Sequence, residues 1–287
     1  MKKGFIFDLD GTIYLDNQLI KGSAETIDYL RNRGHHVVFF TNKSIATRTD
    51  YVKKLNQLGI RTSIEDIINS NYVTARFLKE KMNPLELAYV IGEKALYDEL
   101  EKEGILITED ANLANYIVLG WDRQFTYEKL KQAYMAWRKN HALIIATNPD
   151  RTCPTAEGPV PDCGALIGAF EGVTGIKIDH IMGKPSRFAA DLIVNHILKL
   201  KPEQCYIVGD RLETDIHMGN VYGLHTILVL TGISTQQTIK TTGIQPEYTL
   251  ESVKEMMQIS EIINCEADVF CKKKVQSIAV YKFVYTA

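Results

Sequence analysis

The sequence has few cysteines, no long apolar segment and no surplus of charge of one sign. Its five cysteines are scattered and form no Cys-x-x-Cys pair, which argues against a zinc site and a disulfide framework and favours a reducing cytoplasm. No stretch approaches the about 20 apolar residues of a membrane-spanning helix. The formal net charge is -2 and basic residues form no long run, so nucleic-acid binding has no compositional support.

The pattern of a secretion signal is also missing at the N-terminus. Two lysines lead directly into an apolar strand, and no small-residue cleavage site follows. The composition, 45% hydrophobic and 24% charged, is that of a globular protein, and 287 residues suffice for one large domain or two ordinary ones. We therefore expect a cytoplasmic protein that works without a membrane or nucleic-acid partner.

The first apolar strand pattern ends in two aspartates. Residues 4–12 read Gly-Phe-Ile-Phe-Asp-Leu-Asp-Gly-Thr, so Asp8 and Asp10 would share a face if the strand continued, and Gly11 permits a sharp exit. Carboxylates at the end of a buried strand are costly without a partner, and Mg²⁺ is often bound by one or two of them together with a substrate phosphate. For Asp-x-Asp alone, an ordinary Asp-Gly turn is the alternative.

Polar residues also follow the next predicted strand. Residues 5–42 have the strand–helix–strand pattern of a βαβ unit, whose parallel strands end at the same edge of a sheet. Thr41 and Asn42 should therefore lie near the two aspartates, where a hydroxyl and an amide can donate hydrogen bonds to a phosphoryl oxygen. Taken alone, the pair could equally cap the next helix.

Two later segments carry the same kind of signal. Gly183-Lys184-Pro185 precedes a predicted helix, whose N-terminus favours anions, and its lysine can bind phosphate as a point charge; a solvated surface lysine is the alternative. The apolar run 206–209 ends in Asp210, which would reach the same edge. Asp215 begins the next helix, where a carboxylate is favoured by the helix dipole and can orient the site.

Hydrophobic periodicity and helix-stop residues predict the other elements. Expected helices are 23–33 (with Ser23 as N-cap), 47–58, 65–81, 93–103, 127–140 and 186–200, and expected strands are 36–40, 87–91, 116–119, 142–146 and 225–230. His196 falls on the apolar stripe of the last helix and is expected to be packed or partly buried, whereas Glu213 and His217 should be at the surface.

The separation of Asn42 and Lys184 indicates an inserted domain. About 140 residues lie between them, whereas one further crossover needs only about 30. The surplus of about 100 residues has its own alternation of strands and helices and is the size of a domain. We expect core segments at 1–83 and 178–263 with an α/β insertion at 84–177; one larger continuous sheet is the alternative.

Two further stretches each have more than one interpretation. Residues 147–161 are rich in proline and glycine and predict a long loop, which is either a stiffened connection or a substrate-contacting segment. Asp150 and Arg151 are its first candidates for substrate specificity. Residues 264–287 hold no motif and could form an added strand, a contact between subunits or non-native sequence.

Together and in this order, the four polar segments resemble the motifs of the haloacid-dehalogenase-like (HAD) phosphohydrolases. The resemblance covers roughly residues 1–262, and the insertion between the second and third motifs is similar to that of the NagD-type and 4-nitrophenylphosphatase-type branch. It implies a Rossmann-like doubly wound parallel sheet core, an α/β fold, with an inserted α/β cap domain. A small phosphorylated metabolite as partner and a homodimer formed through the cap are implied as well.

The resemblance also assigns chemical roles. Asp8 corresponds to the nucleophile and Asp10 to the general acid/base, and Mg²⁺ would be held by Asp8, the Asp10 carbonyl and Asp210, with Asp215 in support. The implied phosphate-binding residues are Leu9, Thr41, Asn42 and Lys184.

The implied activity is hydrolysis of sugar phosphates, glycerol phosphate, nucleoside monophosphates or 4-nitrophenyl phosphate. A catalytically weak regulatory protein that binds a phosphometabolite is the alternative. Dehalogenases typically lack the second aspartate, and P-type pumps have Lys-Thr-Gly after the first, so both are disfavoured.

Overall fold

The computed structural model describes residues 2–155, 157–178 and 180–258. They form two compact units. The first comprises residues 2–39, 55–62 and 193–258, and the second comprises residues 40–54 and the described part of 63–192. The predicted tail at 264–287 lies outside the described residues, and the predicted insertion at 84–177 stays a prediction.

The first unit is built on a parallel sheet whose strands are almost wholly buried. The strand order is β14-β13-β12-β1-β4, and β1 and β12 are in register from Gly4↔Cys205 to Phe7↔Val208. Every residue of β1 and β12 is buried, which requires cover on both faces, as in a doubly wound sheet. The strands are β1 (Gly4–Phe7), β4 (His36–Thr41), β12 (Cys205–Gly209), β13 (His225–Val229) and β14 (Tyr248–Leu250).

Short helices and one hairpin complete this unit. They are the hairpin β2 (Tyr14–Leu15) and β3 (Gln18–Leu19), the helices α1 (Ser23–Asn32), α8 (His217–Tyr222) and α9 (Gln236–Thr242), and π-helical turns at Leu192–Leu198 and Leu212–Ile216. The expectation that Ser23 caps α1 is wrong, because the N-cap is Gly22 and Ser23 is a buried helical residue. Gly22 has φ 91°, a left-handed conformation that glycine adopts without strain.

The second unit contains its own parallel sheet, of order β11-β8-β7-β6. The strands are β6 (Ala88–Ile91), β7 (Tyr116–Leu119), β8 (Leu143–Ala146) and β11 (His180–Ile181), and β5 (Ile67–Asn69) lies next to the end of β4. The helices are α3 (Ser70–Lys81), α4 (Lys94–Lys102), α5 (Tyr127–Asn140), α6 (Cys163–Thr174) and α7 (Arg187–Asp191); α2 (Arg48–Gln57) belongs partly to each unit.

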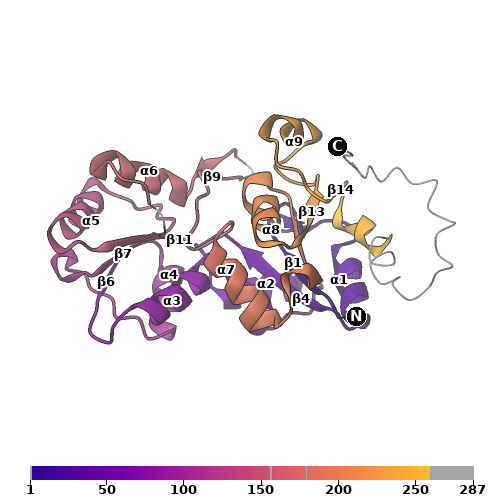
Figure 1. The fold of residues 1–287 in the computed structure, drawn as a ribbon, viewed down its shortest axis with the longest axis horizontal. Coiled ribbons are helices and arrows are strands. Elements are labelled where there is room, and N and C mark those ends of the chain that lie inside the picture. Colours follow the sequence, from indigo (N-terminus) through magenta and orange to yellow (C-terminus); the bar gives the residue numbers. More distant parts are fainter. Residues whose placement is uncertain (1, 156, 179, 259–287) are drawn as a thin grey trace. The chain divides into compact units, whose positions relative to one another are not determined.

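The core of this second sheet lies between β7, β8 and the helices α5 and α6, which cover one face (Figure 1). Leu119, Ile144, Leu166 and Phe170 meet there. The parallel strands joined by helices confirm the predicted α/β class. In the described part of the chain, no helix is long and apolar enough to cross a membrane.

Three further expectations about local structure are wrong. Residues 65–81 are not one helix, because β-branched Ile67 and Ile68 form β5 and Asn69 caps the helix that follows. The stretch 147–161 is not without structure, since Thr152–Cys153 (β9) pairs with Val160–Pro161 (β10) in a hairpin.

The third concerns the helix expected at 186–200. It is α-helical only to Asp191 and then π-helical, and the wider turn changes which side chains face inward. His196 is therefore exposed instead of packed, while Val194 is buried. Glu213 and His217 are exposed, as expected.

Candidate active site

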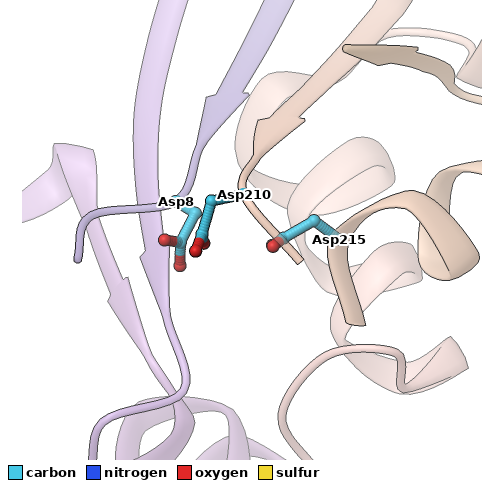
Figure 2. Close-up of side chains that lie close together, drawn as sticks. All are labelled: Asp8, Asp210 and Asp215. Carbon is cyan, nitrogen blue, oxygen red and sulfur yellow. The ribbon is translucent and has the colours of Figure 1, made fainter. Parts of the chain in front are cut away.

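Three aspartates converge at one edge of the sheet in the first unit (Figure 2). Asp8 follows β1, Asp210 follows β12, and Asp215 lies in the π-helical turn shortly after it. Because β1 and β12 are adjacent, parallel and in register, the first two side chains leave the same edge of the sheet. One carboxylate oxygen of each residue lies within 4.8 Å of the others. The structure thus brings Asp8 and Asp210 together and adds Asp215 to them.

The chemistry of this cluster fits a hard divalent cation. Asp8 is 9% exposed, and Asp210 and Asp215 are each 1% exposed. Carboxylates so close together and so little exposed repel one another with little screening by water. Their oxygens are the ligands that Mg²⁺ takes in proteins. No other group of three His, Cys, Asp or Glu side chains with such spacing is found within the ranges that the structure describes.

Main-chain amides hold two of the three carboxylates, and one of these amides belongs to the turn after β13. The amide of Ile233 donates to Asp210 Oδ2 at 2.7 Å, and the amide of Arg211 donates to Asp215 Oδ2 at 3.1 Å. Gly232 leaves room for this arrangement, since a Cβ there would lie 2.0 Å from Asp210 Oδ2. From the sequence, Gly232 is expected only to form a βα turn with Thr231, and neither it nor Ile233 is assigned to the site.

The second predicted catalytic aspartate lies outside this cluster. Gly11, with φ 84°, turns the chain directly after Asp10, whose carboxylate accepts a hydrogen bond from Tyr14 Oη at 3.4 Å. Thr231 Oγ1 donates to the Gly11 carbonyl at 2.6 Å and ties this turn to the one after β13. The side chain of Leu9 is fully buried, so only its main-chain amide could serve a phosphate.

In the second unit, two of the predicted phosphate-binding residues are joined directly. Asn42 Nδ2 donates to the Lys184 carbonyl at 3.1 Å, and the Lys184 amide donates to Asn42 Oδ1 at 2.7 Å. Lys184 Nζ donates to the Phe40 carbonyl at 2.9 Å. Lys184 is 2% exposed and Thr41, whose Oγ1 accepts from the Lys43 amide, is 2% exposed. An ammonium group so deeply buried is costly unless anionic and hydrogen-bonding groups stabilise it.

Buried amide and hydroxyl side chains hold the segment after β4. Ser70 Oγ and Asn148 Nδ2 both donate to the Asn42 carbonyl, at 2.7 and 2.8 Å, and Asn71 Nδ2 donates to the Ser44 carbonyl at 2.8 Å. Ser70, Asn71 and Asn148 are 0% exposed. Sequence reasoning singled out none of the three, because they act through contacts with residues far away in the sequence.

The two candidate specificity residues lie where the chain leaves β8. The Asp150 amide donates to Asn148 Oδ1 at 3.0 Å, and the Arg151 carbonyl accepts from the Asp162 amide at 3.1 Å. Asp150 is partly exposed and Arg151 is exposed, so their side chains are open to a ligand while their main chain is held.

The described cysteines play no part in this chemistry. Cys153, Cys163 and Cys205 are all buried. Burial raises the pKa of the Cys163 thiol to about 12, and its Sγ donates to the Leu119 carbonyl. A thiol that stays protonated at neutral pH is a poor nucleophile.

The chain matches known proteins over most of its length. A haloacid dehalogenase-like hydrolase model matches residues 5–106, and a HAD-hydrolase-like model matches residues 181–256. Sugar-phosphatase AraL of Bacillus subtilis (strain 168) is 37% identical over 260 residues, which are 90% of this chain and 93% of AraL.

Solved structures give the same result. The p-nitrophenyl phosphatase from Archaeoglobus fulgidus has a TM-score of 0.84 at 34% identity, covering 90% of this chain and 99% of that one. Glycerol phosphate phosphatase Rv1692 from Mycobacterium tuberculosis, in complex with magnesium, has a TM-score of 0.80 at 25% identity, covering 89% and 76%. The resemblance that the motifs carry is thereby confirmed, and the chain belongs to the haloacid dehalogenase-like hydrolases.

Proposed function

We propose that this protein is a phosphatase that hydrolyses small phosphate monoesters in two displacements, with Asp8 as nucleophile and Mg²⁺ as cofactor. The observation that carries the proposal is the cluster of Asp8, Asp210 and Asp215, whose oxygens lie within 4.8 Å of one another at the ends of adjacent strands. The proteins it resembles are named sugar, nitrophenyl and glycerol phosphate phosphatases, and one of them was solved with magnesium.

In the first displacement, a carboxylate oxygen of Asp8 attacks the phosphorus of the ester. The bond from phosphorus to the ester oxygen breaks, and the carboxylic acid of Asp10 gives its proton to the departing alcohol. The product is an aspartyl-phosphate on Asp8. The partly exposed position of Asp10 next to Tyr14 supports this role, because a proton donor must stay accessible to the substrate.

In the second displacement, the Asp10 carboxylate removes a proton from water. The water oxygen attacks phosphorus, the bond to Asp8 breaks, and inorganic phosphate leaves. Asp8 is again a carboxylate and Asp10 again an acid, so the cycle closes with one ester and one water consumed.

The cation would compensate the negative charges of the nucleophile and the phosphate. Asp8, the Asp10 carbonyl and Asp210 would hold Mg²⁺, with Asp215 in support. When bound, the ion offsets the repulsion between a carboxylate nucleophile and a phosphate dianion. Such positioning and charge stabilisation supply most of the catalysis in phosphoryl transfer.

Phosphate binding is assigned to Lys184, Thr41, Asn42 and the amide of Leu9. The low exposure of Lys184 supports its part, because a buried ammonium group interacts strongly with a phosphate. Asn42 holds the main chain of Lys184 at two points, so it would also fix where the ammonium group lies.

The proposed substrates are sugar phosphates, glycerol phosphate, nucleoside monophosphates or 4-nitrophenyl phosphate. Their shared part is the phosphoryl group, so selection among the alcohols is assigned to the segment with Asp150 and Arg151. Replacing residues 147–160 by the corresponding segment of a relative should change the ranking of substrates and leave the Mg²⁺ requirement as it was. An unchanged ranking would contradict the assignment of substrate selection to this segment. Dimerisation through residues 84–177 and a cytoplasmic location stay predictions.

The test is phosphate release from a panel of these esters, with Mg²⁺ or with EDTA. The wild-type protein is compared with Asp8→Asn and with Asp28→Asn, an exposed aspartate on α1 that serves as control. We expect release only with Mg²⁺, and only from the wild-type and control proteins. Ester binding without release by the folded wild-type protein would contradict the proposal and favour a regulatory binding protein.

A further inference from the structure

Asn148 bonds two functional segments of the second unit through the two ends of one amide. Its Nδ2 donates to the Asn42 carbonyl at 2.8 Å, and its Oδ1 accepts from the Asp150 amide at 3.0 Å. The side chain is 0% exposed. A buried amide with both ends bonded has little freedom to move, so the distance between Asn42 and Asp150 is set by its length.

The main chain next to Asn148 is bonded to the segment of Lys184. The Thr147 amide donates to the Leu119 carbonyl of β7, and the Thr147 carbonyl accepts from the Gly183 amide at 2.6 Å. A Cβ on Gly183 would meet Asn42 Oδ1 at 2.5 Å and the Thr147 carbonyl at 2.8 Å. The strand end that carries Asn148 is therefore packed tightly against the turn that carries Lys184.

The loop 149–151 is held on its other side by the start of α6. The Gly164 amide donates to the Asp150 carbonyl at 2.8 Å. A Cβ on Gly164 would lie 2.7 Å from the Pro149 and Asp150 carbonyl oxygens. Through these contacts the loop packs against a helix that contacts none of the proposed phosphate-binding residues. The bond between the loop segment and Asn42 is made by Asn148.

We propose that Asn148 is a positioning residue that sets the loop 149–151 against the phosphate-binding segment at Asn42. It would thereby determine the preference for esters with a polar alcohol part, such as sugar phosphates, over 4-nitrophenyl phosphate. The reason is geometric: a sugar phosphate must meet the phosphate-binding residues and the loop at the same time, and a shift of about 1 Å can be costly. The proposal rests on the phosphatase function proposed above.

Two substitutions separate the roles of the two ends. Asn148→Ala removes both bonds, together with the longer one that Nδ2 donates to Thr147 Oγ1 at 3.4 Å. Asn148→Asp keeps an acceptor for the Asp150 amide but replaces the donor to the Asn42 carbonyl by an oxygen. If coupling between the segments matters, both variants should lower kcat/KM for a sugar phosphate about tenfold relative to that for 4-nitrophenyl phosphate. If Asn148 only supported the loop locally, through the Asp150 amide, the ratio of the two kcat/KM values should fall in Asn148→Ala and stay at the wild-type value in Asn148→Asp.

Asn69→Ala is the matched control. Asn69 is also 0% exposed and also makes two bonds, to the Tyr72 amide and the Ala46 carbonyl, but contacts neither Asn42 nor Asp150 through them. The thermal unfolding midpoint of Asn69→Ala should fall about as much as that of Asn148→Ala. The ratio of kcat/KM for the sugar phosphate to kcat/KM for 4-nitrophenyl phosphate should stay at the wild-type value in Asn69→Ala. Gly164→Ala moves the loop from its other side and should lower the ratio without loss of the bond to Asn42.

The outcomes separate this inference from the function on which it rests. A wild-type protein that releases no phosphate from either ester would contradict the proposed function and the inference together. An active wild-type protein, with the wild-type ratio kept in both folded Asn148 variants or lowered in Asn148→Ala alone, would contradict the inference but not the proposed function. We expect a reduced ratio in both variants, with faster amide hydrogen exchange at Asp150 in Asn148→Ala, which loses the acceptor of that amide, than in Asn148→Asp, which keeps it.

Discussion

Gly232→Ala tests whether the turn after β13 fixes the geometry of the acidic cluster. A Cβ at this position would lie 2.0 Å from Asp210 Oδ2 and 2.5 Å from Asp210 Cγ. Contacts between non-bonded heavy atoms are optimal at about 3.5 Å, so the carboxylate must retreat by about 1 Å or more. Asp210 is 1% exposed and its Oδ2 also accepts from the Ile233 amide, so the movement disturbs a packed site.

The expected loss follows from this displacement. A misplacement of about 1 Å can cost about 100-fold in rate, which is about 2.7 kcal/mol of transition-state stabilisation. Because Asp210 is a proposed ligand, the Mg²⁺ concentration for half-maximal activity should rise about 10-fold or more. The assay is release of 4-nitrophenol from 4-nitrophenyl phosphate over a range of Mg²⁺ concentrations.

Gly168→Ala is the control for this substitution. Gly168 is exposed in α6, without a left-handed φ, and a Cβ there would meet no atom within 4 Å. Alanine is the better helix former by about 1 kcal/mol, so this variant should be at least as stable as the wild type and equally active. Wild-type rate and Mg²⁺ dependence in a folded Gly232→Ala protein would refute the reasoning.

Three further predictions follow from single contacts. Lys184→Met removes the ammonium group that donates to the Phe40 carbonyl, and should lower kcat/KM for any phosphate ester about 100-fold without a change in substrate ranking, as measured on the ester panel. Arg48→Met leaves Glu99, which is 1% exposed, without its ion-pair partner and should lower the free energy of unfolding in urea by about 3 kcal/mol. The double variant with Glu99→Gln should lose less stability, because no unpaired charge is then buried. The pKa of the Cys163 thiol is raised to about 12 in the folded state, so the contribution of this thiol to the free energy of unfolding should be present below about pH 9 and be lost as the pH rises towards 12. Cys163→Ala should therefore flatten the profile of stability against pH in this range.

The sequence predicts the parallel strands and the aspartates because both depend on short segments. A buried apolar run followed by Asp8, and again by Asp210, indicates a strand and its polar end without any knowledge of the rest of the chain. Parallel pairing then places these ends at the same edge. The family resemblance follows from the same segments.

Features that depend on distant contacts or on unusual winding could not be predicted in this way. Asn148 bonds Asn42 across 106 positions of the sequence, and nothing in its neighbours reveals that partner. The π-helical turn at Leu192–Leu198 shifts His196 to the surface although the α-helical period places it inside. Gly232 reads as an ordinary turn residue until the carboxylate of Asp210 is seen against it.

The most direct test of the account is detection of the aspartyl-phosphate. The protein is mixed with Mg²⁺ and 4-nitrophenyl phosphate, quenched in acid, and its peptides are measured by mass spectrometry. We expect the mass of one phosphoryl group on the peptide that contains Asp8, more of it in Asp10→Asn, whose second displacement lacks a base, and none in Asp8→Asn. The two-displacement mechanism would be contradicted if the wild-type protein released phosphate while neither it nor the Asp10→Asn variant ever carried this group on Asp8.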